Sequence, residues 1–185
     1  MHTHVTIKAT LRADGREVEH SRTVLCEDDL LREEAESRLG AIAAHWRERR
    51  NVSPFDIPME AGFEPHIAIP GAASHLAIID VSADDLAGYR AVHIGAETQG
   101  MNGFRQETPE RLSPNGPHWS LLLDMAWMKE DLRPVYVETE LAVDGALSRF
   151  VSLLLPVAGD DGRVVRVHVT TRSLLIPEQA MQEPY

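Results

Sequence analysis

The chain has 185 residues and carries 29 acidic against 18 basic side chains, a formal net charge of −11 at pH 7 with histidine neutral. Its hydrophobic content of 43% and charged content of 25% are typical of a globular domain, which excludes a largely disordered chain. The acidic balance disfavours nucleic acid and anionic membranes as partners, because both are bound through cationic surfaces. The single cysteine, Cys26, cannot form an intramolecular disulfide, and the sequence has neither a membrane-spanning apolar run nor a secretory leader, so we expect a cytoplasmic protein.

Residues 1–27 are predicted to form a β-hairpin. From Val5 to Leu11 apolar side chains alternate with polar ones, which is the period of a strand with one buried face. Asp14 and Gly15 follow as a strong turn signal, and the chain is then expected to return as a second strand. The hairpin is an N-terminal extension whose role the sequence leaves open.

Residues 28–50 are predicted to form an amphipathic leading helix. Apolar side chains spaced three or four residues apart make one continuous stripe along it: Leu31, Ala35, Leu39, Ile42 and Trp46. The stripe must cover either the chain's own domain or a second copy, because an isolated helix of this length is only marginally stable in water. We favour the second copy, so a homodimer is expected to form through this helix.

The main domain is expected to span residues 51–176, beginning with a connector rich in proline and glycine at 51–71. Two strands are predicted at 76–81 and 89–94, and the short link between them favours an antiparallel pair. After a polar, glycine-punctuated stretch, a second helix is predicted over 117–132.

Three strands are predicted to complete the domain. Residues 135–143 alternate between apolar and polar side chains, whereas 148–155 are almost continuously apolar, as in a central strand, and Pro156 is expected to end that strand. The last strand covers 164–175, and residues 177–185 form a tail. This order of elements predicts an α+β fold in which an antiparallel sheet carries its helices on one face.

Residues 40–175 also carry a series of short motifs in a particular order and spacing. These are His45-Trp46-Arg47 with Arg49, Ser53-Pro54, Asp56-Ile57-Pro58, Ile78-Ile79-Asp80-Val81, Tyr89-Arg90, Ile94-Gly95, Arg133-Pro134-Val135-Tyr136, Arg149, Leu153-Leu154-Leu155-Pro156 and Asp161-Gly162. Together they resemble a bacterial family of stand-alone PAS-domain proteins. The resemblance implies a PAS-like five-stranded antiparallel sheet with helices on one face and a small cavity between them. It also implies a sensory or interaction module, often dimeric through its leading helix.

Two features depart from that family. The loop over residues 95–103 is shorter than the family's helical segment, so the entrance to the cavity is expected to be remodelled. The hairpin of residues 1–27 lies outside the family pattern. No catalytic residue carries over from the resemblance.

The implied cavity defines a set of ligand-pocket candidates: His118, Trp119, Leu122, Met125, Tyr136 and Leu154. His118 lies near the start of the helix on which haem-binding PAS domains place a histidine, but it directly follows Pro117 and more simply fringes the core. Trp119 and Met125, with Trp127 and Met128, offer adaptable pocket walls, although core and dimer packing is the simpler interpretation. The flavin-photoreceptor cysteine motif is missing, so we expect neither haem nor flavin.

The nine histidines show no metal-binding spacing, and no catalytic signature is present, so we expect no metal site and no catalytic residues. The sequence therefore predicts a non-catalytic sensory or regulatory module that binds a small ligand, a partner protein or both, and signals by a conformational population shift. One alternative is a small α+β enzyme in which His118 or His93 works with a carboxylate such as Asp124. Another alternative is a purely structural dimerisation module.

Overall fold

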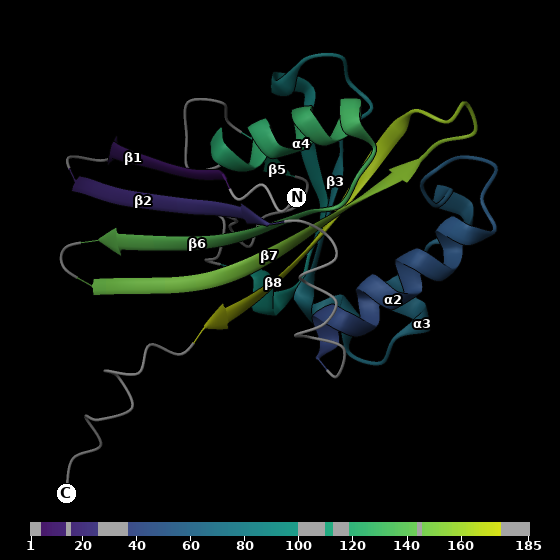
Figure 1. The fold of residues 1–185 in the computed structure, drawn as a ribbon, viewed down its shortest axis with the longest axis horizontal. Coiled ribbons are helices and arrows are strands. Elements are labelled where there is room, and N and C mark those ends of the chain that lie inside the picture. Colours follow the sequence, from purple (N-terminus) through teal and green to yellow (C-terminus); the bar gives the residue numbers. More distant parts are fainter. Residues whose placement is uncertain are drawn as a thin grey trace, which may run out of the picture.

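The computed structural model describes residues 5–13, 16–25, 37–99, 110–112, 119–143 and 146–174. Its strands form one eight-stranded sheet in the order β1-β2-β6-β7-β8-β3-β4-β5, and each neighbouring pair is antiparallel (Figure 1). The strands are β1 (Val5–Ala13), β2 (Arg16–Leu25), β3 (Leu76–Asp80), β4 (Arg90–Ile94), β5 (Glu110–Arg111), β6 (Val135–Val143), β7 (Ala146–Ala158) and β8 (Val164–Leu174). The helices are α2 (Arg38–Asn51), α3 (Pro65–Ala68) and α4 (Trp119–Asp131), with short 3₁₀ turns η1 (Glu60–Gly62), η2 (Ala72–His75), η3 (Leu86–Gly88) and η4 (Ala96–Thr98).

The five strands predicted for the main domain lie side by side as β6-β7-β8-β3-β4. The predicted hairpin of 76–81 and 89–94 forms as β3 and β4, and β6 begins and ends where the alternation of apolar residues predicted. An antiparallel sheet of five strands with helices packed on it is the expected α+β, PAS-like fold, and this prediction is confirmed.

The N-terminal hairpin is a continuation of the sheet. β1 pairs with β2, as the alternating pattern predicted, and β2 then pairs with β6 from Val18 opposite Val143 to Leu25 opposite Tyr136. An edge strand leaves a row of backbone N–H and C=O groups without partners, and β2 supplies these partners along β6. The extension therefore covers an edge that the five-stranded sheet alone would expose.

One face of the central sheet is covered by α2 and the segment that follows it. Alternate residues of a strand point to opposite faces, so Arg166 and His168 of β8 share a face. Arg166 forms an ion pair with Glu60 of η1 (Nε to Oε1, 3.1 Å). The ring of His168 lies 4.9 Å from that of Phe63, which stacks at 5.5 Å on His45 of α2. The predicted connector, which contains Phe63, is thus part of the packed core.

The opposite face of the sheet is covered by α4. Val165 points away from the Arg166 side of β8 and lines a cleft together with Ala126 and Lys129 of α4. Figure 1 shows α4 on one side of the sheet and α2 with α3 on the other. Helices therefore cover both faces of the sheet, which corrects the expectation that they gather on one face.

The leading helix packs against its own domain. Ser37 caps α2 by accepting a hydrogen bond from the Gly40 amide at 3.1 Å. Leu39, Ile42 and Trp46 are at most 4% exposed in the core of the same chain. This corrects the expectation that these three side chains form a dimer interface, because their apolar surface is already covered within the monomer. Leu31 and Ala35 lie outside the described residues, and a homodimer, which stays a prediction, requires another surface.

The strand β7 continues through Pro156 to Ala158, so the prediction that this proline ends the strand is wrong. The N and the C=O of one strand residue point to the same side, and the carbonyl of Pro156 accepts a hydrogen bond from Trp46 Nε1 at 2.8 Å. The missing N–H of Pro156 therefore points away from β8 and costs no ladder hydrogen bond. On that side the pairing of β7 with β6 extends only as far as Leu154, opposite Val135, so no β6 residue lies beside Pro156 to need its N–H.

The turn between β7 and β8 requires glycine at position 162. Gly162 has φ +81°, and a Cβ there would lie 2.6 Å from Cε1 of Phe55. We expect Gly162→Ala to lower the free energy of unfolding by about 2 kcal/mol, through left-handed strain and this contact. Gly62→Ala is the matched control, because a Cβ at that position meets nothing within 4 Å. Urea denaturation of both variants checks the prediction, and equal stabilities would contradict it.

Candidate functional site

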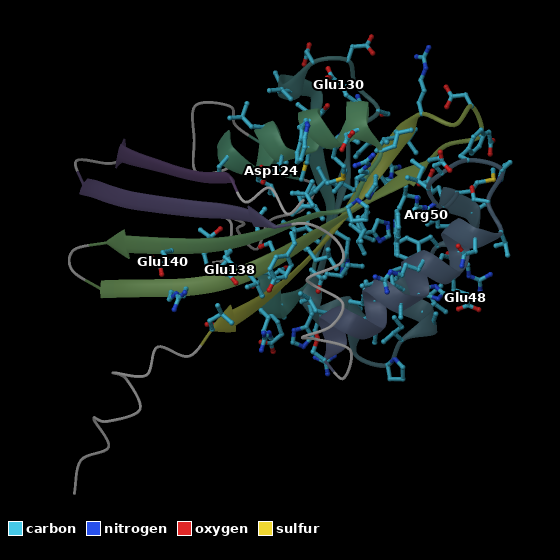
Figure 2. All side chains as sticks on the ribbon, in the orientation of Figure 1. Glu48, Arg50, Asp124, Glu130, Glu138 and Glu140 are labelled. Carbon is cyan, nitrogen blue, oxygen red and sulfur yellow. The ribbon has the colours of Figure 1, made fainter. Side chains whose placement is uncertain are left out.

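An open cleft of about 970 Å³ lies where the C-terminal half of α4 meets the loop carrying η3 and the turn joining β7 to β8. Apolar side chains of Leu86, Leu132 and Val165 form part of its wall. Its acidic lining residues outnumber its basic ones and are Asp84, Asp85, Glu130 and Asp161, against Lys129 and Arg163. Figure 2 shows Glu130 at the end of α4 beside that loop, whereas Glu138 and Glu140 lie on β6, away from the cleft. The cleft can therefore receive a cationic group beside an apolar one.

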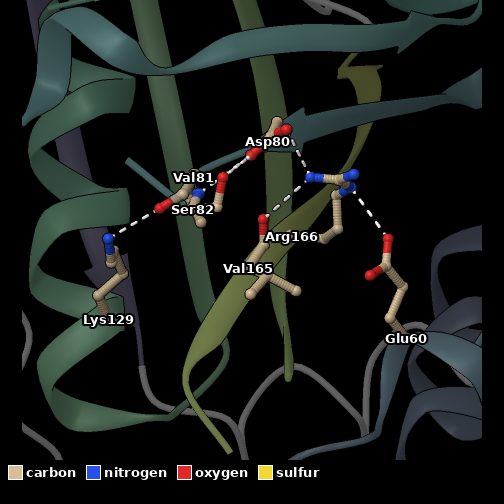
Figure 3. Close-up of polar contacts among 7 residues, drawn as sticks. All are labelled: Glu60, Asp80, Val81, Ser82, Lys129, Val165 and Arg166. Carbon is tan, nitrogen blue, oxygen red and sulfur yellow. Dashed lines mark hydrogen bonds and ion pairs between the residues drawn. The ribbon is translucent and has the colours of Figure 1, made fainter. Parts of the chain in front are cut away.

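Lys129 ties α4 to the chain just beyond β3. Its Nζ donates hydrogen bonds to the carbonyls of Val81 at 2.7 Å and Ala83 at 2.9 Å (Figure 3 shows the first). The same ammonium lies 5.2 Å from the centre of the Tyr89 ring, within the range of a cation–π interaction. The position of α4 is thus coupled to the backbone at the end of β3.

A chain of polar contacts continues from this point through the sheet to its other face (Figure 3). Asp80 Oδ1 accepts hydrogen bonds from the Ser82 amide at 3.0 Å and the Ser82 hydroxyl at 2.6 Å. Asp80 Oδ2 lies 2.7 Å from Nη1 of Arg166, and the same guanidinium pairs with Glu60. Burial alone would raise the pKa of Asp80, but the hydrogen bonds from Ser82 and the charge of Arg166 lower it. An ionised Asp80 therefore joins the α4 side to η1.

We expect Lys129→Met to destabilise the fold by about 2 kcal/mol, because two partly buried carbonyls lose their charged donor. Arg133→Met is the matched control, since Arg133 is exposed and its contact with Asp131 is 3.7 Å long. Removing that surface cation should change stability by less than about 0.5 kcal/mol. Thermal and urea unfolding of both variants give the comparison. Equal effects would mean that the Lys129 contacts do not hold α4.

The structure brings several histidines to the α2 face of the sheet. Ile78 of β3 pairs with His93 of β4 on one side and with His168 of β8 on the other, so the two histidines share a row and a face. His93 Nε2 lies 2.9 Å from the carbonyl oxygen of Ala73. His168 is 4% exposed, and within the described residues its Nδ1 has no hydrogen-bond partner. Among those residues, no group of three or more His, Cys, Asp or Glu side chains is placed to hold a metal ion.

His168 does not support the acid–base alternative. Burial, and then the charges of His66, Arg166 and His93, lower its pKa to about 3. A base this weak does not abstract protons efficiently near neutral pH, and no carboxylate orients its Nδ1 in the described structure. His118 lies outside the described residues, and Asp124 is a buried side chain of α4.

The four ligand-pocket candidates that the structure describes do not all lie on one side of the sheet. Leu122, Met125 and Leu154 are at most 1% exposed and belong to the apolar core. Tyr136 lies opposite Leu153, so it points to the other face of the sheet from Leu154. The side chain of Trp119 and all of His118 lie outside what the structure describes. None of the four described candidates lines the cleft, and their role as a pocket stays a prediction.

Sequence reasoning missed Lys129, Asp80 and Arg166. One signal was present for the first of them: Lys129 follows Leu122 and Met125 on the inner, apolar stripe of its helix. A lysine on such a stripe needs a polar partner beneath the helix. Asp80 and Arg166 are polar residues on their strands, and the sequence carries no comparable signal for their contact.

Comparisons with known proteins leave the chain without an assigned family. No family model matches it. No curated protein matches it either. Among solved structures it is similar to the structure of an RNA-binding light-oxygen-voltage receptor, with 13% identity over 93% of this chain and 78% of that chain and a TM-score of 0.37. The fold class follows from the strand order of the chain itself. In the described part of the chain, no helix has the length and apolar character needed to cross a membrane.

Proposed function

We propose that the chain is a non-catalytic sensory or regulatory module of the cytoplasm, with a PAS-like fold, that passes its signal to a partner protein. The polar chain from Lys129 through Asp80 and Arg166 to Glu60 carries this proposal. It joins an open cleft beside α4 to the segment that follows α2 on the opposite face of the sheet. A module that signals needs such a connection between a binding surface and a distant element.

The mechanism is a population shift between two packings of α4. In the packing seen here, Lys129 holds the carbonyls of Val81 and Ala83. An occupant that draws α4 outward releases these carbonyls, which frees the backbone beside Asp80 and loosens its contacts with Ser82 and Arg166. The Arg166–Glu60 pair then weakens, and η1 and α2 respond. The occupant shifts the equilibrium only by its difference in affinity for the two packings.

The position of the cleft favours a protein partner over a small molecule enclosed in the core. Leu122, Met125 and Leu154 are packed at 1% exposure or less where the sequence predicted a ligand pocket. The cleft, in contrast, opens to the surface beside α4. The large negative charge of the chain favours a partner with a basic surface.

Native mass spectrometry of the freshly purified chain tests this proposal. We expect an assembly of two subunits, as the sequence predicts, formed through a surface other than the buried stripe of α2. Any retained small molecule should leave without chemical change on gas-phase activation and on incubation with the protein. A monomeric mass would contradict the dimer. Conversion of a retained molecule into a product would contradict the non-catalytic role.

A further inference from the structure

The outer face of α4 carries two large apolar side chains in solvent. Leu123 is 52% exposed and Trp127 is 51% exposed, and their spacing of four residues places them next to each other on the helix surface. The inner stripe of the same helix is complete without them, since Leu121, Met125 and Met128 are buried. An exposed tryptophan beside a leucine is typical of an interaction site, because tryptophan contributes most when a partner covers it.

This apolar pair is continuous with the acidic side of the cleft. Ala126 and Glu130 line the cleft from α4, and each lies three residues after a member of the apolar pair, Leu123 and Trp127 respectively, so they are neighbours on the helix surface. Asp84 and Asp85 line it from the loop that carries η3. Asp85 Oδ1 accepts a hydrogen bond from the Gly88 amide at 2.8 Å. In the described structure neither Asp84 nor Glu130 forms an ion pair.

The two cations of the cleft are already engaged. The Lys129 ammonium donates to the carbonyls of Val81 and Ala83. Arg163 lies 3.6 Å from Asp161, with which it forms an ion pair. Hydrogen bonds to neutral carbonyls leave the charge of Lys129 in place, so the acidic balance of the cleft rests on its four carboxylates facing two cations.

Tyr89 supplies a polar group on the wall of the cleft. This residue is 2% exposed and lines the cleft. Burial, and then the charges of Asp84 and Asp85, raise its pKa, so the phenol keeps its proton at neutral pH. Its hydroxyl group can therefore donate a hydrogen bond to a carbonyl of an occupant.

We propose that these residues form one docking surface for a basic amphipathic segment of a partner protein. The α4 docking surface consists of Leu123, Trp127, Glu130, Asp84, Asp85 and Tyr89. An apolar side chain of the segment packs on Leu123 and Trp127, and a neighbouring arginine enters the cleft toward Glu130 and Asp84. A backbone carbonyl of the segment accepts from the Tyr89 hydroxyl. This assignment deepens the proposed function by naming its output surface, and it rests on that function.

The acidic charge of the surface favours a basic segment over a second copy of the chain, a nucleic acid or an anionic membrane. A second copy of the chain brings a net charge of −11 to a surface that is itself acidic, and nucleic acid and anionic membranes bring phosphates. Like charges placed across an interface cost several kcal/mol. A guanidinium group fits best, because it can pair with two carboxylates while its apolar stem lies on the tryptophan.

Two amidated peptides serve as probes, and their binding is measured by calorimetry and by the intrinsic tryptophan fluorescence of the chain. One carries leucine and arginine on the same helix face, and in the other each arginine is replaced by glutamate. We expect the basic peptide to bind and the acidic one not to bind. Trp127→Ala and Glu130→Arg should each lower the affinity for the basic peptide by at least about tenfold. Glu130→Arg should also admit the acidic peptide.

The matched controls are Ile67→Ala, which removes an apolar side chain that is 70% exposed on α3, and Glu48→Arg, which reverses a charge on the exposed side of α2. Both should leave the affinity of the basic peptide within about twofold of the original value. All four substituted side chains are exposed, so the variants should fold. Failure of the basic peptide to bind, equal binding of both peptides, or equal losses in the controls would overturn the docking surface. The subunit count and the chemical inertness tested by mass spectrometry would remain unaffected, so the two proposals fail separately.

Discussion

Replacing Trp46 with alanine is expected to remove about 4 kcal/mol from the free energy of unfolding. Trp46 is 1% exposed, and its indole Nε1 donates to the Pro156 carbonyl at 2.8 Å. Truncation leaves a large cavity between α2 and the sheet and also leaves that carbonyl without its donor. A loss of this size is a large fraction of the roughly 5 to 15 kcal/mol by which a typical domain is stable. Urea denaturation followed by far-UV circular dichroism measures it.

Trp46→Phe separates the two contributions, because it keeps most of the ring volume and removes only the indole donor. We expect this variant to lose about 1 to 2 kcal/mol. If the stripe of α2 served a dimer instead, the unfolding midpoint would rise with protein concentration and Trp46→Ala would remove that dependence. Such a result would contradict the packing of α2 on its own sheet.

The stability of the protein is expected to fall as the pH is lowered from about 6.5 toward 3, chiefly because of His168. Burial holds the pKa of His168 at about 3 in the folded chain, whereas an unfolded histidine titrates near 6.5. Above pH 6.5 both states are neutral and this group contributes no pH dependence. Below it the unfolded chain binds a proton that the folded chain does not, at about 1.4 kcal/mol per pH unit. The loss reaches about 2 kcal/mol at pH 5.

His168→Leu should flatten this dependence, because leucine keeps the packing against Phe63 and cannot bind a proton. Some slope should remain, since burial first, and then a nearby arginine, also lower the pKa of His45 and of His75. Asp80 acts at lower pH, because its lowered pKa means that its contribution is lost only as the pH falls below about 4. Ile67→Ala, at an exposed position without a titratable group, is the control. Equal slopes for wild type and His168→Leu would contradict the assignment.

Much of the fold could be predicted because local patterns determine it. Strict alternation of apolar and polar residues predicted β6 with its observed bounds, and the Asp14-Gly15 turn signal predicted the pairing of β1 with β2. The end of β7 could not be predicted. Whether Pro156 breaks a strand depends on which side its missing N–H faces, and that depends on where β6 begins. The docking of the hairpin on β6 is a long-range pairing that no local pattern encodes.

The candidate site was harder to predict than the fold. The apolar stripe of α2 was recognised, but a stripe does not say which surface covers it, and the structure shows that Leu39, Ile42 and Trp46 cover their own sheet. The cleft combines residues from a loop, a helix and a turn that are far apart in the sequence. In the sequence, only the position of Lys129 on an apolar helix stripe indicates a polar contact beneath α4.

The cleft beside α4 is proposed to communicate with η1 through Lys129, Asp80 and Arg166. NMR relaxation dispersion of backbone amides at both ends of this chain of contacts tests the claim most directly, in wild type and in Lys129→Met, with Arg133→Met as control. We predict that the amides of Val81 and Glu60 exchange with one common rate, and that Lys129→Met shifts the populations at both while Arg133→Met shifts neither. If Lys129→Met changed the exchange of the Val81 amide but not that of the Glu60 amide, the proposed coupling would be contradicted.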